Sequence, residues 1–283
     1  MVTRTVPDLR AAILERRLAG DSVGFVPTMG FLHEGQLSLV RSAAEQNGCV
    51  VVSCFVNPTV FSNAQELASY PRDEARDLAL LERERVDIVF LPDVHTVYPV
   101  DDLTRVTVEG LTRRLEGASR PGYLDGLTTA TLKLINLVGP ARLYLGQKEA
   151  QRVVVIRRML RDLFVNLEVV VCPTVRDPDG LAISAANRAL SIEERHAATC
   201  LFAALESVRK AYERGERSAE VLRARMTDVI AAESMARPDY ISVADAYSLD
   251  ELQRITGPAL ALLAVWIGRT RLTDCLPLAW DAA

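Results

Sequence analysis

The sequence lacks the long apolar run that a membrane-spanning helix requires. Residues 260–267 form an apolar segment, but Gly257-Pro258 and Gly268 bound it, and crossing a bilayer takes about 20 residues. The N-terminus carries no apolar stretch of the kind that precedes a secretory cleavage site. We therefore expect a soluble, cytoplasmic protein with no membrane partner.

Histidine and paired cysteine are also scarce. The three histidines show no metal-ligand spacing, which argues against a zinc site. The five cysteines are odd in number, form no C-x-x-C pair and mostly lie in apolar runs: Cys49, Cys54, Cys172, Cys200 and Cys275. Such cysteines are typical of reduced packing residues in a cytosolic protein.

A basic excess is missing as well. The chain has 33 Lys and Arg residues against 37 Asp and Glu residues, a net charge of −4, which gives no indication of nucleic-acid binding. Lysine is especially rare and is found only at Lys133, Lys148 and Lys210. With 283 residues and a hydrophobic content of 49%, the chain is long enough for one large or two modest domains.

The sequence does contain an alternation of β-branched apolar runs and helical patterns. The runs lie at residues 23–26, 50–55, 88–91, 143–145 and 167–171, and the helical patterns at 37–46, 72–84, 130–138 and 151–163. This alternation predicts an α/β fold with a parallel sheet covered on both faces. Right-handed crossovers would bring the loops after the strands to one edge, where such sheets bind ligands.

The pattern changes after Pro173-Thr174. A polar turn at residues 176–180 leads into helical sequence from 191 to 232, and two strand-like runs follow at 240–244 and 260–267. We expect residues 1–173 to form a Rossmann-like ligand-binding domain. Residues 174–283 should form a smaller C-terminal α+β lid domain.

The most informative segment joins a strand to a helix through a glycine-containing turn. An apolar run ends at Pro27, and an amphipathic run begins near Gly35. A strand, a turn and a helix N-terminus in this order place backbone N–H groups and the helix dipole against phosphates. His33 lies in the turn, where its side chain could contact a nucleotide.

Six segments, in matching order along the chain, resemble the pantothenate synthetase (pantoate–β-alanine ligase) family. They are Pro27–Gln36, Phe55–Thr59, Tyr70–Arg72, Leu115–Gly122, Leu145–Glu149 and Pro173–Ser184. The resemblance implies a nucleotidyltransferase-like fold of the H-x-G-H type, a homodimer, and ATP with Mg²⁺. It also implies that a carboxylic acid and ATP form an acyl-adenylate with loss of pyrophosphate, and that an amine then displaces AMP.

The resemblance assigns catalysis to His33, Lys148 and Gln36. It assigns ATP binding to Pro27, Met29, Gly30, His33, Gly35, Gly146, Lys148, Ser184 and Arg188. Lys148 follows a strand and a glycine, so its ammonium group could reach a phosphate, although a surface lysine is the alternative. Glu149 stands where the family has aspartate and is a candidate Mg²⁺ ligand.

The acid-binding residues expected from the resemblance are Met29, Asn57, Val60, Tyr123 and Arg152. Val60 and Arg152 stand where the family uses two glutamines to hold pantoate. A guanidinium in place of an amide suggests a more anionic acid, unless Arg152 lies in solvent or pairs with Glu149. For Met29 and Asn57, packing and turn formation are the alternatives.

Two other positions depart from the family pattern. Gln36 replaces the second signature histidine, and residues 184–188 read S-A-A-N-R where the family has S-S-R-N-R. We therefore expect an ATP-dependent carboxylate–amine ligase whose acid differs from pantoate. The alternatives are genuine pantoate–β-alanine ligation, nucleotidyl transfer without amide formation, and a catalytically weak nucleotide- or metabolite-binding paralogue.

Overall fold

The structure, a computed structural model, describes residues 1–280 and divides into two compact units. The first unit contains residues 1–145 and 155–172, and the second contains residues 146–154 together with the chain from Pro173 onward. Each unit has its own sheet and its own apolar core. Segment 146–154, which carries Lys148 and Arg152, thus belongs to the second unit.

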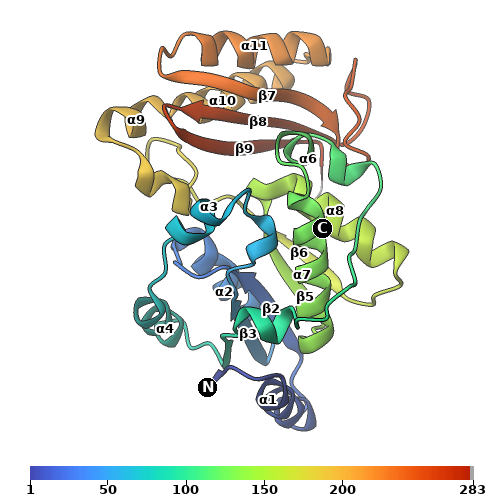
Figure 1. Cartoon of the computed structure of the whole chain (residues 1–283). Coiled ribbons are helices and arrows are strands. Elements are labelled where there is room, and N and C mark those ends of the chain that lie inside the picture. Colours follow the sequence, from blue (N-terminus) through green and yellow to red (C-terminus); the bar gives the residue numbers. More distant parts are fainter. Residues whose placement is uncertain (281–283) are drawn as a thin grey trace. The chain divides into compact units, whose positions relative to one another are not determined.

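The first unit is built around a six-stranded sheet in the order β1-β4-β3-β2-β5-β6 (Figure 1). Its strands are β1 Val2–Thr3, β2 Val23–Thr28, β3 Cys49–Cys54, β4 Ile88–Phe90, β5 Arg142–Gly146 and β6 Glu168–Cys172. β2 pairs in parallel with both β3 and β5, and β3 pairs in parallel with β4. The predicted parallel sheet is confirmed, and each predicted apolar run is a strand. β1 is too short for a sequence pattern to reveal it.

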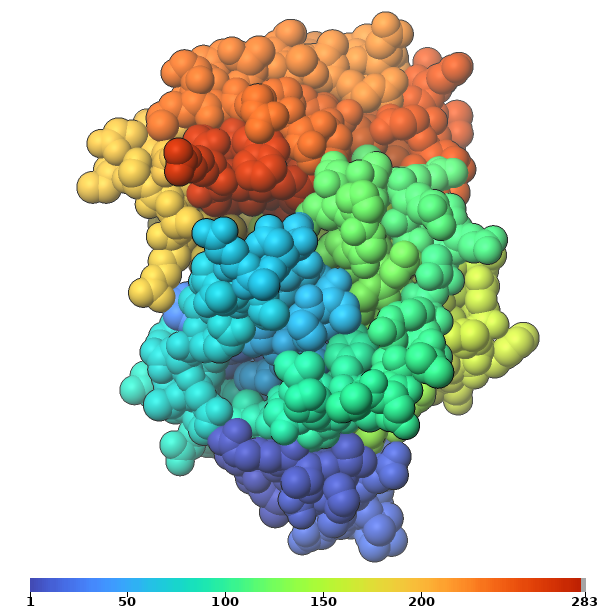
Figure 2. Space-filling model, viewed as in Figure 1, coloured from blue at the N-terminus to red at the C-terminus, as the bar shows by residue number. Residues whose placement is uncertain are grey.

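Helices cover more of this part of the chain than the patterns predict. Their bounds are α1 Val6–Leu18, α2 Glu34–Gln46, α3 Ala64–Ser69, α4 Glu74–Arg83, α5 Val94–Val97, α6 Glu116–Ser119, α7 Tyr123–Val138 and α8 Ala150–Asp162, with 3-10 helices η1 Pro58–Val60, η2 Leu111–Arg113 and η3 Gln147–Glu149. α7 begins directly after Gly122, whose left-handed φ of 83° suits glycine. α3 has no buried residue and lies at the surface of the first unit (Figure 2).

The core of the first unit fastens the strand–turn–helix segment to the sheet. Leu37 and Val40 of α2 belong to one apolar cluster with Val26 of β2 and Val52 of β3. Leu32, in the turn, is 1% exposed and belongs to the same cluster. Apolar burial therefore helps to hold the turn in place.

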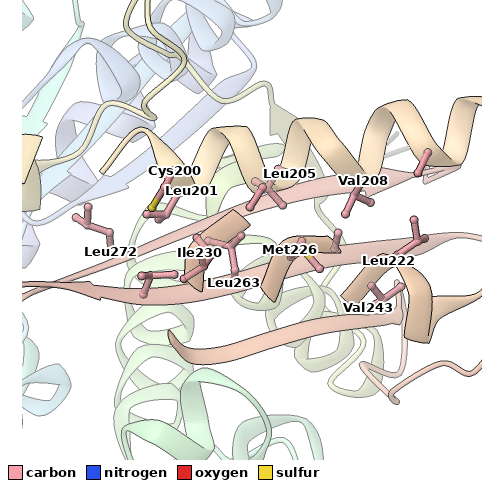
Figure 3. Close-up of a cluster of buried hydrophobic side chains, with 14 of the residues drawn as sticks. Cys200, Leu201, Leu205, Val208, Leu222, Met226, Ile230, Val243, Leu263 and Leu272 are labelled. Carbon is pink, nitrogen blue, oxygen red and sulfur yellow. The ribbon is translucent and has the colours of Figure 1, made fainter. Parts of the chain in front are cut away.

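The second unit combines a three-stranded antiparallel sheet with helices. Its elements are η4 Ala185–Ala189, α9 Ile192–Ala197, α10 Cys200–Glu213, α11 Ala219–Ala231, β7 Ala236–Asp245, β8 Ala259–Ile267 and β9 Thr270–Leu278. Figure 3 shows apolar side chains of α10 and α11 meeting those of the sheet, among them Leu205, Met226 and Leu263. The predicted α+β character is confirmed. β9 is not apparent in the sequence because charged residues interrupt its apolar pattern.

The state of the cysteines and the lengths of the described helices bear on two expectations from the sequence. All five cysteines are free, and the four that are buried, Cys49, Cys172, Cys200 and Cys275, lie where packing residues are expected. Within the described part of the chain, no helix combines the length and the apolar character that spanning a bilayer requires.

Candidate functional site

The turn between β2 and α2 has an unusual backbone. Gly30 and Phe31 have positive φ angles of 75° and 50°, a region that residues other than glycine seldom adopt. A β-carbon at Gly30 would lie 3.0 Å from a carboxylate oxygen of Asp77. Conformation and space therefore both favour glycine at position 30. The strained Phe31 needs support from its surroundings to keep its conformation.

Four consecutive N–H groups of this turn, at residues 30–33, donate to side chains of the protein itself. Their acceptors, in order, are Thr28 Oγ1 at 3.2 Å, Asp77 Oδ2 at 2.6 Å, Asp77 Oδ1 at 2.8 Å and Gln36 Oε1 at 3.0 Å. These four groups therefore already have acceptors within the protein, and contact between the backbone of this turn and phosphates stays a prediction. An anion here would have to be met by nearby side chains and by the first N–H groups of α2, at Glu34 and Gly35, where a helix offers no internal acceptor.

Gln36 has a local structural role in this arrangement. Its side-chain oxygen accepts the N–H of His33, the residue that caps α2. Glutamine at the third helical position commonly makes this bond in a capping box. The amide nitrogen of the same side chain carries two further N–H donors, so the catalytic role expected for Gln36 stays a prediction.

Among the expected acid-binding residues of the first unit, Asn57 is held by internal hydrogen bonds. Asn57 is 5% exposed, its Oδ1 accepts the Thr59 N–H at 3.1 Å, and its Nδ2 donates to the Gly126 carbonyl at 3.1 Å. Asn57 therefore shapes the turn at η1, as the alternative reading of its sequence had it. Val60 is buried as well, at 6% exposure, whereas Met29 and Tyr123 are partly exposed.

Two connecting residues were not among the predicted site residues. Asp77 lies on the buried face of α4 with Leu81. An acidic residue on the apolar face of a helical pattern is visible in the sequence and could have indicated a residue with a specific role. Arg120 donates to the Val60 carbonyl at 2.9 Å, and its guanidinium lies 4.3 Å from the centre of the Tyr123 ring. Arg120 thus brings two expected acid-binding residues together.

The second unit carries the remaining predicted residues. Lys148 lies in η3, directly after Gly146 at the end of β5, and its Nζ donates to Thr273 Oγ1 of β9 at 3.4 Å. Arg152 donates to Glu149 Oε2 at 2.9 Å, across three positions of the helical segment. Arg152 thus pairs with Glu149, which is one of the alternatives considered for it, while its Nε is buried with no hydrogen-bond partner among the residues that the structure describes.

The residues expected to clamp the phosphates also make local bonds. Ser184 Oγ donates to Asn187 Oδ1 at 2.8 Å, and Asn187 Nδ2 donates to the Ala182 carbonyl at 3.0 Å. Arg188 is exposed. Among residues 1–280 no three His, Cys, Asp or Glu side chains converge as a metal site, so Glu149 has no such partners for an ion bound by the protein alone.

Cys54, next to the turn, is expected to stay a thiol. Burial raises the pKa of its thiol to about 11, with the negative charge of Asp77 adding to the effect. A raised pKa makes the thiol's contribution to stability present below its ordinary pKa of 9.0 and lost as pH rises toward 11. Native protein treated with iodoacetamide at pH 8 should therefore leave Cys54 unmodified, whereas urea-unfolded protein should be alkylated there, as read by mass spectrometry. Rapid alkylation of the native protein would contradict this prediction.

Comparison with known proteins identifies the family. The family model described as Pantoate-beta-alanine ligase matches residues 1–277. The pantothenate synthetase of Roseiflexus castenholzii is 52% identical over 96% of this chain and 97% of its own length. That of Acidobacterium capsulatum is 48% identical over 95% of this chain and 94% of its own length.

Solved structures agree with this assignment. Pantothenate synthetase from Thermus thermophilus has a TM-score of 0.92 at 43% identity and covers 97% of this chain and 98% of its own. The Francisella tularensis enzyme, crystallised with β,γ-ATP and β-alanine, has a TM-score of 0.78 at 31% identity and covers 100% of this chain and 99% of its own. The match extends over both units, and this chain belongs to the pantoate–β-alanine ligase family, whose members are ATP-dependent, amide-forming ligases.

Proposed function

We propose that this protein is a genuine pantoate–β-alanine ligase. The observation that carries the proposal is the similarity to pantothenate synthetases over the whole chain, at 52% identity with the Roseiflexus castenholzii enzyme. The expectation of an altered acid rested on several exchanges around the site, and the expectation of a more anionic acid rested on Arg152. Glu149 pairs with the Arg152 guanidinium at 2.9 Å, which weakens Arg152 as a reason to expect a more anionic acid.

The reaction has two steps. A carboxylate oxygen of pantoate attacks the α-phosphorus of ATP, the bond from that phosphorus to the bridging oxygen breaks, and pyrophosphate leaves. The amine of β-alanine then attacks the acyl carbon, the bond to the AMP oxygen breaks, and the nitrogen loses a proton. The first step needs in-line positioning and neutralisation of the charge on the leaving group.

We assign the residues of this chain to these needs. Lys148 would bring a positive charge to the phosphates, and His33, at the start of α2, would donate a hydrogen bond to the α-phosphate. The helix N-terminus adds a favourable dipole for the same anion. Gln36 would support the position of His33 through the bond from its side-chain oxygen to the His33 N–H.

Mg²⁺ and a homodimer complete the proposal. In nucleotide sites Mg²⁺ keeps water ligands and is bound by phosphate oxygens with one or two carboxylates, and Glu149 is the candidate carboxylate here. Its Oε2 accepts from Arg152 at 2.9 Å. The homodimer is proposed on the family resemblance alone.

A substrate screen tests the function. With ATP and pantoate we expect pyrophosphate release, and with β-alanine added we expect AMP and pantothenate in equal amounts. The control is the same assay with a dicarboxylic acid of similar size in place of pantoate. Faster turnover of the dicarboxylate would favour the altered acid. Pyrophosphate release without amine-dependent AMP release would favour nucleotidyl transfer, and no turnover would favour a binding paralogue.

A further inference from the structure

We propose that Asp77 is a positioning residue that holds His33 in place for the reaction. The inference rests on the proposed function, in which His33 contacts the α-phosphate. Asp77 acts through the backbone of Phe31 and Leu32, in the turn that leads from β2 to His33. It does not itself contact a substrate.

The geometry of the Asp77 carboxylate carries the proposal. Asp77 lies on α4 and is 4% exposed. Its Oδ2 accepts the Phe31 N–H at 2.6 Å, and its Oδ1 accepts the Leu32 N–H at 2.8 Å. Each oxygen of one buried carboxylate is thus matched to one of two successive N–H groups. Hydrogen bonds with an ionised acceptor are shorter and stronger than neutral ones.

The turn needs such a support. Successive N–H groups near a left-handed residue form a concave site that attracts anions, and here the carboxylate of the protein fills it. Phe31 has a φ of 50°, which persists only where the surroundings enforce it. Arg76, next to Asp77 on α4, adds a second contact, with its guanidinium 5.2 Å from the centre of the Phe31 ring.

His33 is therefore anchored on both sides along the chain. Before it, the N–H of Leu32 is held by Asp77, and the Leu32 side chain is 1% exposed in the core. After it, the side chain of Gln36 accepts the N–H of His33. An error of about 1 Å in the position of a catalytic group can lower a rate by about 100-fold, so the loss of one anchor should be visible in catalysis.

The test compares two identical substitutions on the same helix. Asp77→Asn keeps the shape of the side chain. It replaces one carboxylate oxygen by an NH₂ group, which cannot accept the backbone N–H of Phe31 or Leu32. Asp73→Asn is the control, because Asp73 caps α4 by accepting the Arg76 N–H at 3.1 Å and asparagine caps a helix about as well. We expect kcat for pyrophosphate release to fall at least about tenfold in D77N, at a temperature where it is fully folded. D73N should match the parent protein.

A double-mutant cycle separates positioning from simple stabilisation. If Asp77 acts through His33, D77N should have little further effect on kcat in an H33A background, because the group it positions is already gone. Equal fold-changes in both backgrounds would overturn the proposal. If D77N does not fold, D77E keeps the carboxylate but moves it, and wild-type kcat in D77E would likewise overturn it.

Amide hydrogen exchange tests the anchor without any activity. Exchange of the Phe31 and Leu32 amides, followed by NMR, should be slow in the parent protein and faster in D77N but not in D73N. This readout distinguishes the two proposals. A parent protein that makes no pantothenate but protects these amides refutes the proposed function while supporting the anchor. Fast exchange in an active parent refutes the anchor alone.

Discussion

Lys148→Met is expected to lower kcat for pantothenate formation by about 100-fold or more, since a positioned donor to developing charge contributes about that much. Lys148 is one of three lysines in the chain. It lies at the end of β5, in η3, with its Nζ held by Thr273 at 3.4 Å. Methionine keeps the length of the side chain and removes the charge. Pre-steady-state release of pyrophosphate measures the affected step directly.

Lys210→Met is the matched control for this prediction. Lys210 lies in the last turn of α10, and its side chain is 59% exposed. We expect K210M to retain the activity of the parent protein, and thermal unfolding should show that both variants are folded. If K148M keeps full activity, Lys148 has no catalytic role and is simply a surface lysine. If K148M and K210M lose activity equally, the effect is not specific to the site.

Asp274→Asn should lower the free energy of unfolding by about 3–5 kcal/mol, the usual effect of leaving one partner of a buried ion pair uncompensated. Arg176 binds Asp274 through both carboxylate oxygens, at 2.5 and 3.0 Å. The Asp274 side chain is 1% exposed, and that of Arg176 is 21% exposed. The guanidinium also lies 4.9 Å from the centre of the Phe202 ring. This pair joins β9 to the turn before η4.

Urea denaturation followed by tryptophan fluorescence is the measurement. Both tryptophans of the chain, Trp266 and Trp280, belong to the second unit, so the signal reports on the unit that contains the ion pair. The control is Glu251→Gln, because Glu251 pairs with Arg223 at 2.9 Å but is 52% exposed. Such exposed pairs contribute about 1 kcal/mol or less. Similar losses in D274N and E251Q would contradict the argument from burial.

A double replacement sharpens the same prediction. Arg176→Met together with Asp274→Leu removes both charges and leaves none buried. We expect this variant to be less destabilised than either single variant, because apolar side chains of similar size can replace a buried pair at little loss. An additive loss would show that the two residues stabilise the protein independently of their pairing.

The strands and the main helices follow from the sequence because their causes are local. A buried parallel strand is a continuous apolar run, and such runs mark β2, β3, β4, β5 and β6. β9 is different, since Arg271 and Asp274 interrupt it. Its charged Asp274 is buried only because Arg176 lies 98 residues earlier in the chain and meets it. No local pattern contains that information.

The candidate site shows the same division. The sequence by itself determined the family and the β2–turn–α2 segment, whereas the requirement for glycine at position 30 became visible only in the φ of 75° and the approach of Asp77. Tertiary structure alone decided that the turn N–H groups bind Asp77, 46 and 45 positions further along the chain. It also decided that Arg152 pairs with Glu149. Backbone conformation and apolar burial are properties of short segments, whereas the partner of a charged side chain depends on which segments folding brings together.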